Sequence, residues 1–330
     1  MKYTRNSSTN PYYNMAMEEY MLKGLSPEEE YFVLWQNRPA IIVGKHQNTL
    51  EEINTDYVRD HNISVVRRLS GGGAVYHDAG NVNFTFIINN VQREFLNFRR
   101  FTLPVVRALD SIGVKAELSG RNDLTIDGRK FSGNAQYLFG NRLLHHGTLL
   151  FNSELEVLQN ALNVDPSKIQ SKGIKSVRSR VTNIRDHLDK DISISEFINL
   201  ITRYVFEFHG EHFEGYRFSP EDQQNISWLM EEKYITWDWN YGQSPPFNFK
   251  NSNRFAGGKV EVLLEVKNGL ISGCKIYGDF LGVGDAADIE KMVKGLRYAA
   301  DDMRRVLDNI DMRRYFGGIS TQELISCFFA

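Results

Sequence analysis

The sequence predicts an α+β fold with a mostly antiparallel or mixed sheet. Pairs of short apolar runs separated by turn signals, which are typical of β-hairpins, alternate with segments of helical periodicity. Regular βαβ units, which would favour a parallel sheet, are not evident. At roughly 150 residues for each domain, the length of 330 residues predicts about two domains.

The N-terminal part begins with a helix and continues with short strands. Asn10 is suited to cap the helix, Pro11 occupies its first turn, and the apolar stripe ends at Gly24. Two β-rich runs then flank a turn signal at residues 37–39. The strands expected in this part of the chain are residues 31–36, 40–44, 65–69, 74–77 and 84–88.

The middle of the chain contains a strong turn signal. Asp127-Gly128 lies between two β-rich runs and favours a type I′ hairpin, which places Lys130 at the start of the returning strand. Ser153 and Glu156 have the spacing of a capping box for a helix that continues to Leu162. The other elements expected here are a helix over residues 103–112 and strands over 114–118, 124–126 and 143–151.

Apolar periodicity lapses over residues 165–180, where lysines and arginines mix with serines as in a mobile basic loop. A second capping box, Ser193 with Glu196, precedes a predicted helix. Pro245-Pro246 interrupts a polar segment and marks the predicted boundary between domains of residues 1–245 and 246–330. The remaining elements expected are helices over 195–209 and 221–230, a hairpin of 259–266 with 270–277, and helices near 289–310 and 321–329.

Composition argues against several classes of protein. The 39 lysines and arginines nearly balance the 41 aspartates and glutamates, so the chain as a whole does not attract nucleic acid or an anionic membrane. The first ten residues lack the apolar region of a signal peptide, and no stretch reaches the ~18 apolar residues of a membrane span. We therefore expect a cytoplasmic protein. The two cysteines, Cys274 and Cys327, indicate neither a disulfide framework nor a zinc site.

Three consecutive glycines follow a predicted strand in the segment from Arg67 to Asp78. Glycines at positions 71–73 permit positive φ and a close approach of backbone N–H groups to a ligand, as in an anion-binding nest. Arg67 or Arg68 could then neutralise a phosphate or a carboxylate. The segment is neither a Walker A loop nor a G-x-G-x-x-G fingerprint. A flexible loop with solvated arginines is the alternative interpretation.

A second group combines Asp123 with Lys130 and the small residues that follow the lysine. A lysine on a strand is held in place, and its compact cation can oppose charge that develops on a carboxylate or phosphate. An exposed lysine after a turn is the alternative. His145 and His146 would point to opposite faces of a strand, so they cannot both line one site. The basic segment 168–180 is either a clamp for a polyanion or a solvated charge run.

Five ordered motifs together resemble the lipoate–protein ligase family, and the N-terminal helix and C-terminal segment extend the resemblance over nearly the whole chain. It implies a large catalytic domain of the biotin/lipoate-ligase type and a small α+β accessory domain. ATP and lipoate are the implied substrates, and Mg²⁺ is the expected metal ion, with ligands that the resemblance does not assign. The motifs are Arg67–Asp78, Ser119–Asp123, Lys130–Gln136, His145–Leu149 and Ser179–Ile184.

The resemblance also implies roles for individual residues. Lys130 matches the essential lysine of the family, which contacts both the acyl carboxyl group and the adenylate, and residues 168–180 correspond to the adenylate-binding loop. The residues expected to bind ATP or the adenylate are Arg68, Gly73, Ala74, Val75, Tyr76, Asp123, Lys130 and Arg180. Those expected to bind lipoate are Arg68, Ser70, Gly71, Gly72, Lys130 and His146.

The implied function is a two-step ligation through lipoyl-AMP. The acceptors would be lipoyl domains of 2-oxo acid dehydrogenase acyltransferase subunits and the glycine-cleavage H protein. One alternative is an octanoyltransferase of the same fold, which works through an acyl-cysteine; Cys274 and Cys327 lie outside the predicted catalytic domain, which argues against it. The other is a non-catalytic regulator that binds lipoate or adenylate, and the intact Lys130 and glycine loop count against it.

Overall fold

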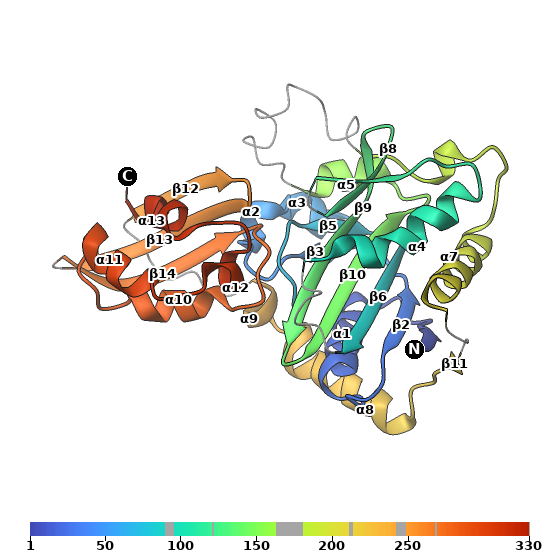
Figure 1. The fold of residues 1–330 in the computed structure, drawn as a ribbon, viewed down its shortest axis with the longest axis horizontal. Coiled ribbons are helices and arrows are strands. Elements are labelled where there is room, and N and C mark those ends of the chain that lie inside the picture. Colours follow the sequence, from blue (N-terminus) through green and yellow to red (C-terminus); the bar gives the residue numbers. More distant parts are fainter. Residues whose placement is uncertain are drawn as a thin grey trace. The chain divides into compact units, whose positions relative to one another are not determined.

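Two compact units make up the chain, and neither is continuous in sequence. The computed structural model describes residues 1–89, 96–120, 122–162, 181–210, 214–241, 249–267 and 269–329. The first unit contains residues 1–42, 53–66 and 75–236, and the second contains residues 43–52, 67–74 and 237–330. Figure 1 shows the elements of both units. The predicted domain boundary at residues 245 and 246 lies outside the described residues and stays a prediction.

The first unit is built on an eight-stranded sheet in the order β11-β1-β2-β6-β10-β9-β8-β7. Strand β1 runs parallel to β2 and β11, and the other described pairs are antiparallel. The sheet is therefore mixed, as predicted. Its strands are β1 Lys2–Arg5, β2 Tyr31–Trp35, β6 Asn81–Asn89, β7 Glu117–Ser119, β8 Asp123–Ile126, β9 Arg129–Phe139, β10 Arg142–Leu150 and β11 Glu214–Gly215.

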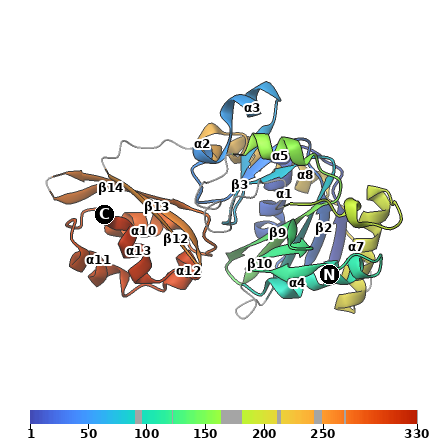
Figure 2. The same cartoon turned by 90° about the horizontal axis from the view of Figure 1, so that it is seen from above.

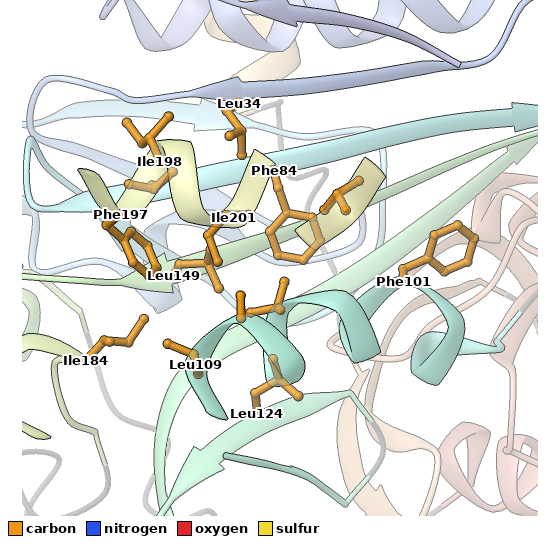
Figure 3. Packing of buried hydrophobic residues seen from close by; sticks show 14 of the residues in the cluster. Leu34, Phe84, Phe101, Leu109, Leu124, Leu149, Ile184, Phe197, Ile198 and Ile201 are labelled. Atoms are coloured by element: carbon orange, nitrogen blue, oxygen red, sulfur yellow. The ribbon is translucent and has the colours of Figure 1, made fainter. Parts of the chain in front are cut away.

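The two faces of this sheet differ in chemistry. Helices α4 (Phe98–Asp110) and α7 (Ile194–His209) cover one face, and α1 (Pro11–Lys23) lies on the other (Figure 2). On β6 the even-numbered side chains, such as Phe84 and Phe86, enter the apolar core beneath α4 and α7 (Figure 3). The odd-numbered Asn81, Asn83 and Thr85 are buried on the opposite face. Because alternate residues of a strand share a face, the α1 side of the sheet is lined with polar groups.

A buried arginine fastens α1 to the sheet. The Arg142 guanidinium on β10 donates to the carbonyl oxygens of Met21 (3.4 Å), Leu22 (2.7 Å) and Leu25 (3.2 Å). Carbonyl groups at the end of a helix have no partner within the helix, so a cation there satisfies them and complements the helix dipole. This contact sets the position of α1 over the polar face.

The rest of the first unit surrounds these layers. A small sheet has the order β4-β3-β5. Its strands are β3 Ala40–Val43, β4 Ser64–Arg67 and β5 Val75–His77. The remaining elements up to residue 240 are α2 Thr49–Glu52, α3 Thr55–Asp60, α5 Leu155–Ala161, η2 Arg185–His187, α8 Pro220–Leu229, the π-helical turn η3 Met230–Tyr234 and α9 Trp237–Asn240. Among them, α2 and α9 belong to the second unit.

The second unit has its own α+β core, as predicted. An antiparallel sheet in the order β12-β13-β14 packs with four helices around buried residues that include Val262, Phe280 and Phe316. The elements are β12 Phe249–Phe255, β13 Gly258–Lys267, β14 Leu270–Gly278, α10 Ala286–Val293, α11 Ala300–Leu307, α12 Met312–Phe316 and α13 Thr321–Phe328. None of the helices described in either unit combines the length and apolar character that a membrane crossing requires.

Several local predictions are confirmed. Asn10 caps α1 by accepting a hydrogen bond from the Tyr12 N–H group. Asp127 and Gly128 have φ values of 51° and 73°, the two positive values that a type I′ turn needs. Ser193 and Glu196 form the predicted capping box of α7.

Other local predictions are wrong. Helix α5 begins after Glu154 without a side-chain cap, because Asn183 and Asp78 accept the N–H groups of Ser153 and Glu154 instead. Helix α4 starts at Phe98, five residues before the predicted start, since Asn97 caps it and Pro104 is accommodated inside it. The strand expected at 114–118 is β7 at Glu117–Ser119, and the helix expected near 289–310 is divided into α10 and α11.

Candidate functional site

Lys130 and Asp123 form an ion pair on neighbouring strands of the main sheet. The Lys130 Nζ atom lies 2.8 Å from Asp123 Oδ1, and each side chain is 37% exposed. Asp123 opens β8, and Lys130 is the second residue of β9, as the hairpin signal predicted. A cation and a carboxylate that both reach solvent can be approached by a charged ligand, so this pair is the centre of the candidate site.

A β-bulge turns Lys130 toward Asp123. Leu124 pairs with Ser132, but the next residue of β8, Thr125, pairs with Lys130, so Phe131 is an additional residue on β9. Phe131 is fully buried in the apolar core. Bulges bend a strand and change the direction of a side chain. Here the bulge places Lys130 on the same face as Gly133, which lies directly opposite Asp123.

Gly133 makes room for the lysine ammonium group. A Cβ atom at this position would lie 2.9 Å from Lys130 Nζ and 3.1 Å from Cε. Any side chain here would therefore displace the ammonium group from its place beside Asp123. The predicted motif contained this glycine, but its spatial relation to Lys130 depends on the bulge.

The chain that follows the predicted adenylate-binding loop is bound to the strand of Lys130. Val181 forms a parallel bridge with Lys130, and the Thr182 N–H group donates to the Lys130 carbonyl oxygen at 2.9 Å. A cavity of about 550 Å³ borders this segment and is also lined by Arg129 and Asn183. The basic loop expected at 165–180 and Arg180, which was expected to bind the adenylate, lie outside the described residues.

His146 belongs to a buried hydrogen-bonded group under α1. Its Nδ1 atom lies 3.0 and 3.1 Å from the two carboxylate oxygens of Glu18. The Thr85 hydroxyl also donates to Glu18 and accepts from the indole N–H group of Trp35 at 3.0 Å. Because Glu18 on α1 lies 128 residues before His146, no local sequence pattern indicates this pairing.

The register of the sheet relates His146 to Lys130. His146 on β10 is opposite Ala135 on β9, and Ala135 is two residues from Gly133. Alternate residues of a strand share a face, so His146 lies on the face that carries the Lys130–Asp123 pair. His145 therefore lies on the opposite face, in the core. The structure thus brings Lys130, Asp123 and His146 onto one face of one sheet.

The predicted glycine loop, residues 71–73, belongs to the second unit. Arg68 stabilises it through hydrogen bonds to groups of the same loop. The Arg68 guanidinium donates to Ser70 Oγ (3.0 Å) and to the carbonyl oxygens of Gly71 (2.7 Å) and Gly73 (2.8 Å). Gly72 has φ of 94° and donates its N–H group to the Phe280 carbonyl oxygen at 3.3 Å. A Cβ atom on Gly71 would lie 2.4 Å from that oxygen. At least two of the glycines are therefore required by the loop itself.

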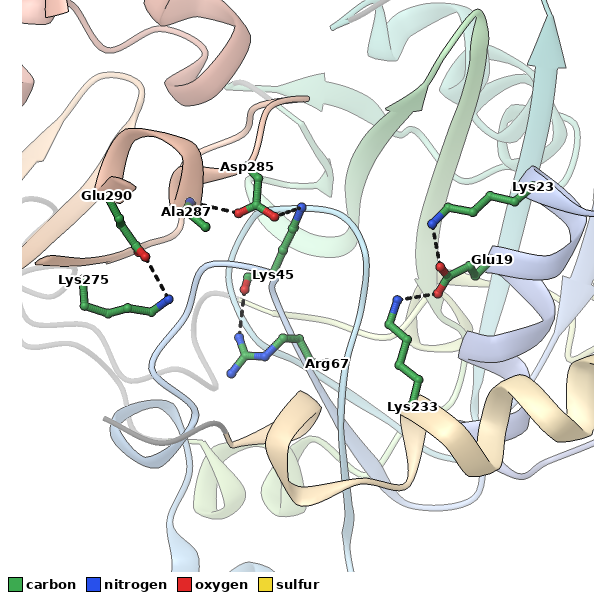
Figure 4. A network of polar contacts seen from close by, with 9 residues as sticks. All are labelled: Glu19, Lys23, Lys45, Arg67, Lys233, Lys275, Asp285, Ala287 and Glu290. Atoms are coloured by element: carbon green, nitrogen blue, oxygen red, sulfur yellow. Dashed lines mark hydrogen bonds and ion pairs between the residues drawn. The ribbon is translucent and has the colours of Figure 1, made fainter. Parts of the chain in front are cut away.

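Arg67 holds the segments of the second unit together. Its guanidinium donates to six groups, and burial lowers the pKa of Arg67 to about 10. Figure 4 shows the contact with the Lys45 carbonyl oxygen, and Lys45 in turn pairs with Asp285 at 3.0 Å. The arginine therefore has a structural role within this unit. The six acceptors are the carbonyl oxygens of Gly44, Lys45, Gln47, Trp239 and Asn240 and the hydroxyl of Thr49.

The segment predicted to bind the nucleotide and lipoate is divided between the units. Arg68 and residues 70–74 belong to the second unit, whereas Val75 and Tyr76 lie on β5 in the first. Tyr76 is buried, and this burial raises the pKa of its phenol. It lines a cavity of about 690 Å³ together with Asp78 and Glu154.

The described residues contain neither a cysteine with a lowered pKa nor a cluster of metal ligands. Cys274 and Cys327 both belong to the second unit, and burial raises the pKa of each thiol. In the part of the chain that the structure describes, no group of three or more histidine, cysteine, aspartate or glutamate side chains is arranged to hold a metal ion.

Comparison with known proteins relates nearly the whole chain to lipoate–protein ligases. Residues 10–206 match the lipoyl protein ligase A/B catalytic domain, and residues 244–328 match the bacterial lipoate protein ligase C-terminus. Lipoate–protein ligase 1 of Staphylococcus aureus is 50% identical over 327 residues, which cover 98% of this chain and 99% of the relative.

Two solved structures of similar proteins contain lipoate or ATP. LipL1 of P. falciparum, in complex with lipoate, has a TM-score of 0.76 and 27% identity, with 94% of each chain covered. A lipoate–protein ligase A bound with ATP has a TM-score of 0.63 and 26% identity, and the match covers 73% of this chain and 97% of that chain.

Proposed function

The chain belongs to the lipoate–protein ligase family, and we propose that Lys130 is the residue at which it activates lipoate. The protein is an ATP-dependent lipoate–protein ligase. It converts lipoate to lipoyl-AMP and transfers the lipoyl group to a lysine of an acceptor protein. The observation that supports the proposed role of Lys130 is its fixed position, 2.8 Å from Asp123 and directly above Gly133.

In the first step, a carboxylate oxygen of lipoate attacks the α-phosphorus of ATP, and the bond to the β-phosphate oxygen breaks to release pyrophosphate. Negative charge builds up on the phosphate oxygens during this displacement. A preorganised ammonium group stabilises such charge because it needs no reorientation during the reaction. We assign this role to Lys130, with Asp123 holding the ammonium group until the substrates bind.

In the second step, the amine of an acceptor lysine attacks the acyl carbon of lipoyl-AMP. An amide bond forms, AMP leaves with the electron pair of the acyl–oxygen bond, and the amine releases a proton. We assign to Lys130 here the polarisation of the acyl carbonyl group. This step requires no covalent intermediate on the enzyme.

The remaining predicted residues keep their proposed roles. Arg68 and residues 70–76 are proposed to bind lipoate and the nucleotide, and Arg180 the adenylate. His146 is proposed to bind lipoate. It is buried under α1 on the face that carries Lys130 and lies beside the Glu18 carboxylate, which would repel a triphosphate more strongly than lipoate.

Mg²⁺ is proposed to accompany the triphosphate. This ion is usually held by one or two carboxylates together with substrate phosphates and water, so it does not require a cluster of protein ligands. The partly exposed carboxylate of Asp123 fits that donor set. Bound Mg²⁺ would neutralise phosphate charge, while Lys130 orients the reacting carboxyl group.

The acceptors are proposed to be lipoyl domains of 2-oxo acid dehydrogenase acyltransferase subunits and of the glycine-cleavage H protein, in the cytoplasm. Membership of the family supports this proposal, as does a similar solved structure of a bipartite lipoate protein ligase and its E2 lipoyl domain. An experiment with purified acceptor domains, in which each domain is weighed after reaction with ATP and lipoate, would report the added lipoyl mass directly.

A lipoate-dependent ATP–pyrophosphate exchange assay tests the proposed mechanism against its alternatives. A ligase exchanges pyrophosphate only when lipoate is present, whereas an octanoyltransferase or a regulator does not exchange it. Acyl transfer through a cysteine would also need a reactive thiolate. The thiols of the partly buried Cys274 and the buried Cys327 have raised pKa values, which argues against that route.

A further inference from the structure

We propose that His145 is a positioning residue for Lys130, and that it acts from the opposite face of the sheet through Asn134 and Asn122. This inference rests on the proposed role of Lys130. His145 lies in the apolar core and does not face the site, but an unbroken series of hydrogen bonds leads from its ring to the residue that precedes Asp123.

The direction of each hydrogen bond in this series is determined. Gln136 Oε1 accepts from the Leu96 N–H group at 2.6 Å, so the amide nitrogen of Gln136 must be the atom 3.0 Å from His145 Nδ1. Nδ1 therefore accepts, and the proton of the neutral ring is on Nε2. Nε2 then donates to Asn134 Oδ1 at 3.3 Å. Burial and the neighbouring His146 keep the pKa of His145 well below its usual value, which agrees with a neutral ring.

Asn134 connects His145 to Asn122, the residue that precedes β8. With Oδ1 fixed by His145, its amide nitrogen donates to the Asn122 carbonyl oxygen at 3.1 Å. The same carbonyl accepts the Asn134 backbone N–H group at 3.0 Å, and the Asn122 side chain donates back to the Asn134 carbonyl oxygen. Three hydrogen bonds thus hold Asn122 against β9. The next residue is Asp123, whose carboxylate holds Lys130.

The surroundings of His145 indicate that its two ring nitrogens are not needed for packing. Its ring is fully buried and stacks on Phe101 with 4.3 Å between centroids, and Phe84, Phe86 and Phe98 lie within 6.3 Å. An apolar aromatic ring would fill this space without polar atoms to satisfy. Buried polar networks are often no more stabilising than apolar replacements, but they can specify one arrangement of the groups they connect.

The arrangement specified here is the start of the hairpin that carries Lys130. The bulge at Phe131 interrupts the pairing of β8 with β9 just where the ammonium group must be placed. Pairing on the other side of the bulge depends on Asn122 and Asp123 staying in register with Asn134 and Gly133. Without the hydrogen bond from His145, the Asn134 amide keeps only the Asn122 carbonyl oxygen and Ser132 Oγ as partners, and Asp123 is held less firmly.

The test uses His145→Phe in the full-length enzyme, because phenylalanine keeps the stacked ring and removes both nitrogen atoms. We expect kcat for lipoyl-AMP formation to fall roughly 10- to 100-fold, as small displacements of a catalytic group do. The KM values for ATP and lipoate should change less than about threefold. Phe101→Leu is the matched control, since it disturbs the same aromatic cluster and leaves the hydrogen bonds in place; its kcat should stay near that of the native enzyme.

A second variant keeps the test decisive if His145→Phe folds poorly. Asn122→Ala removes the last side chain of the series at a partly exposed position. Its loss of kcat should not add to that of His145→Phe in the double variant, because both changes release the same strand. Equal loss of kcat in Phe101→Leu, or fully additive losses in the double variant, would overturn the proposal. Full activity of Lys130→Met would instead contradict the proposed function, whatever His145→Phe does.

Discussion

Gly133 lies beneath the ammonium group of Lys130, so close that a Cβ atom at position 133 would be 2.9 Å from Nζ. The two residues belong to the same strand and are brought to one face by the bulge at Phe131. The absence of a side chain at position 133 is therefore part of what places the cation beside Asp123.

Gly133→Ala should inactivate the enzyme while leaving the fold intact. The added methyl group would push the ammonium group aside, and a displacement of about 1 Å can cost roughly 10²-fold in rate. Lipoate-dependent ATP–pyrophosphate exchange measures the loss, and thermal unfolding measures the stability. Gly215→Ala is the matched control, because among the described residues other than its chain neighbours no atom lies within 4 Å of a Cβ atom there. Comparable exchange rates for the two variants would show that Lys130 does not need this space.

Glu18→Gln should weaken lipoate binding without changing ATP binding. The amide would retain one acceptor but lose the charge that His146 Nδ1 and the Thr85 hydroxyl contact under α1. We expect the KM for lipoate to rise roughly tenfold, about 1.5 kcal/mol, the lower end of the range for one altered hydrogen bond to a charged group. The neighbouring Glu19→Gln serves as a control, since Glu19 contacts Lys23 and Lys233 instead (Figure 4). A rise in KM for ATP, or none for lipoate, would remove His146 and Glu18 from the acyl site.

The stability contributed by Glu19 should depend on pH. Burial alone would raise the pKa of its carboxyl group, but Lys233, Lys23 and Tyr234 outweigh burial and lower it below the ordinary value of 4.5. A lowered pKa means that the folded state favours the carboxylate, so this stabilisation is present above pH 4.5 and is lost as the pH falls through the folded-state pKa. The difference in unfolding free energy between the native protein and Glu19→Gln should therefore shrink on acidification. A difference that stays constant from pH 7 to pH 3 would contradict this.

Octanoate should be a poorer but usable substrate. Lipoate and octanoate present the same eight-carbon chain, and each methylene-sized difference in an apolar pocket supplies only about 1–3 kcal/mol of discrimination. Competition between the two acids for formation of the acyl adenylate measures the preference. A preference above roughly 10⁴ would require a polar contact that reads the dithiolane ring. The buried Glu18–His146 pair would then be the first group to examine.

The sequence predicted the elements whose causes are local. Asn10 caps α1, and Asp127-Gly128 forms the hairpin that presents Lys130, because both depend on residues a few positions apart. The bulge at Phe131 was not predictable, since it depends on how a buried phenylalanine packs against α4 and α7. The predicted cap at Ser153 failed for the same kind of reason: Asn183, 30 residues away, competes for its N–H group.

The candidate site shows the same division between local and long-range causes. The motifs identified Lys130, Asp123 and His146, but not the helix residue Glu18 that binds His146 or the hydrogen bonds of His145 on the other face. Alternation along a strand predicted that the two histidines would separate, and it could not decide which partners each would find. Arg67 and Arg68 both bond to backbone carbonyl groups within the second unit, and the motif did not indicate these acceptors.

The yield of lipoyl-AMP from Lys130→Met, compared at matched thermal stability with the double variant Cys274→Ser, Cys327→Ser, tests the account most directly. The lysine variant should lose roughly 10²–10³ or more in rate, as expected when a preorganised charge is removed, and Lys130→Arg should restore little because a planar guanidinium does not replace a compact ammonium group. The cysteine-free enzyme should keep nearly full activity. A fully active Lys130→Met enzyme, or an inactive cysteine-free one, would contradict the mechanism.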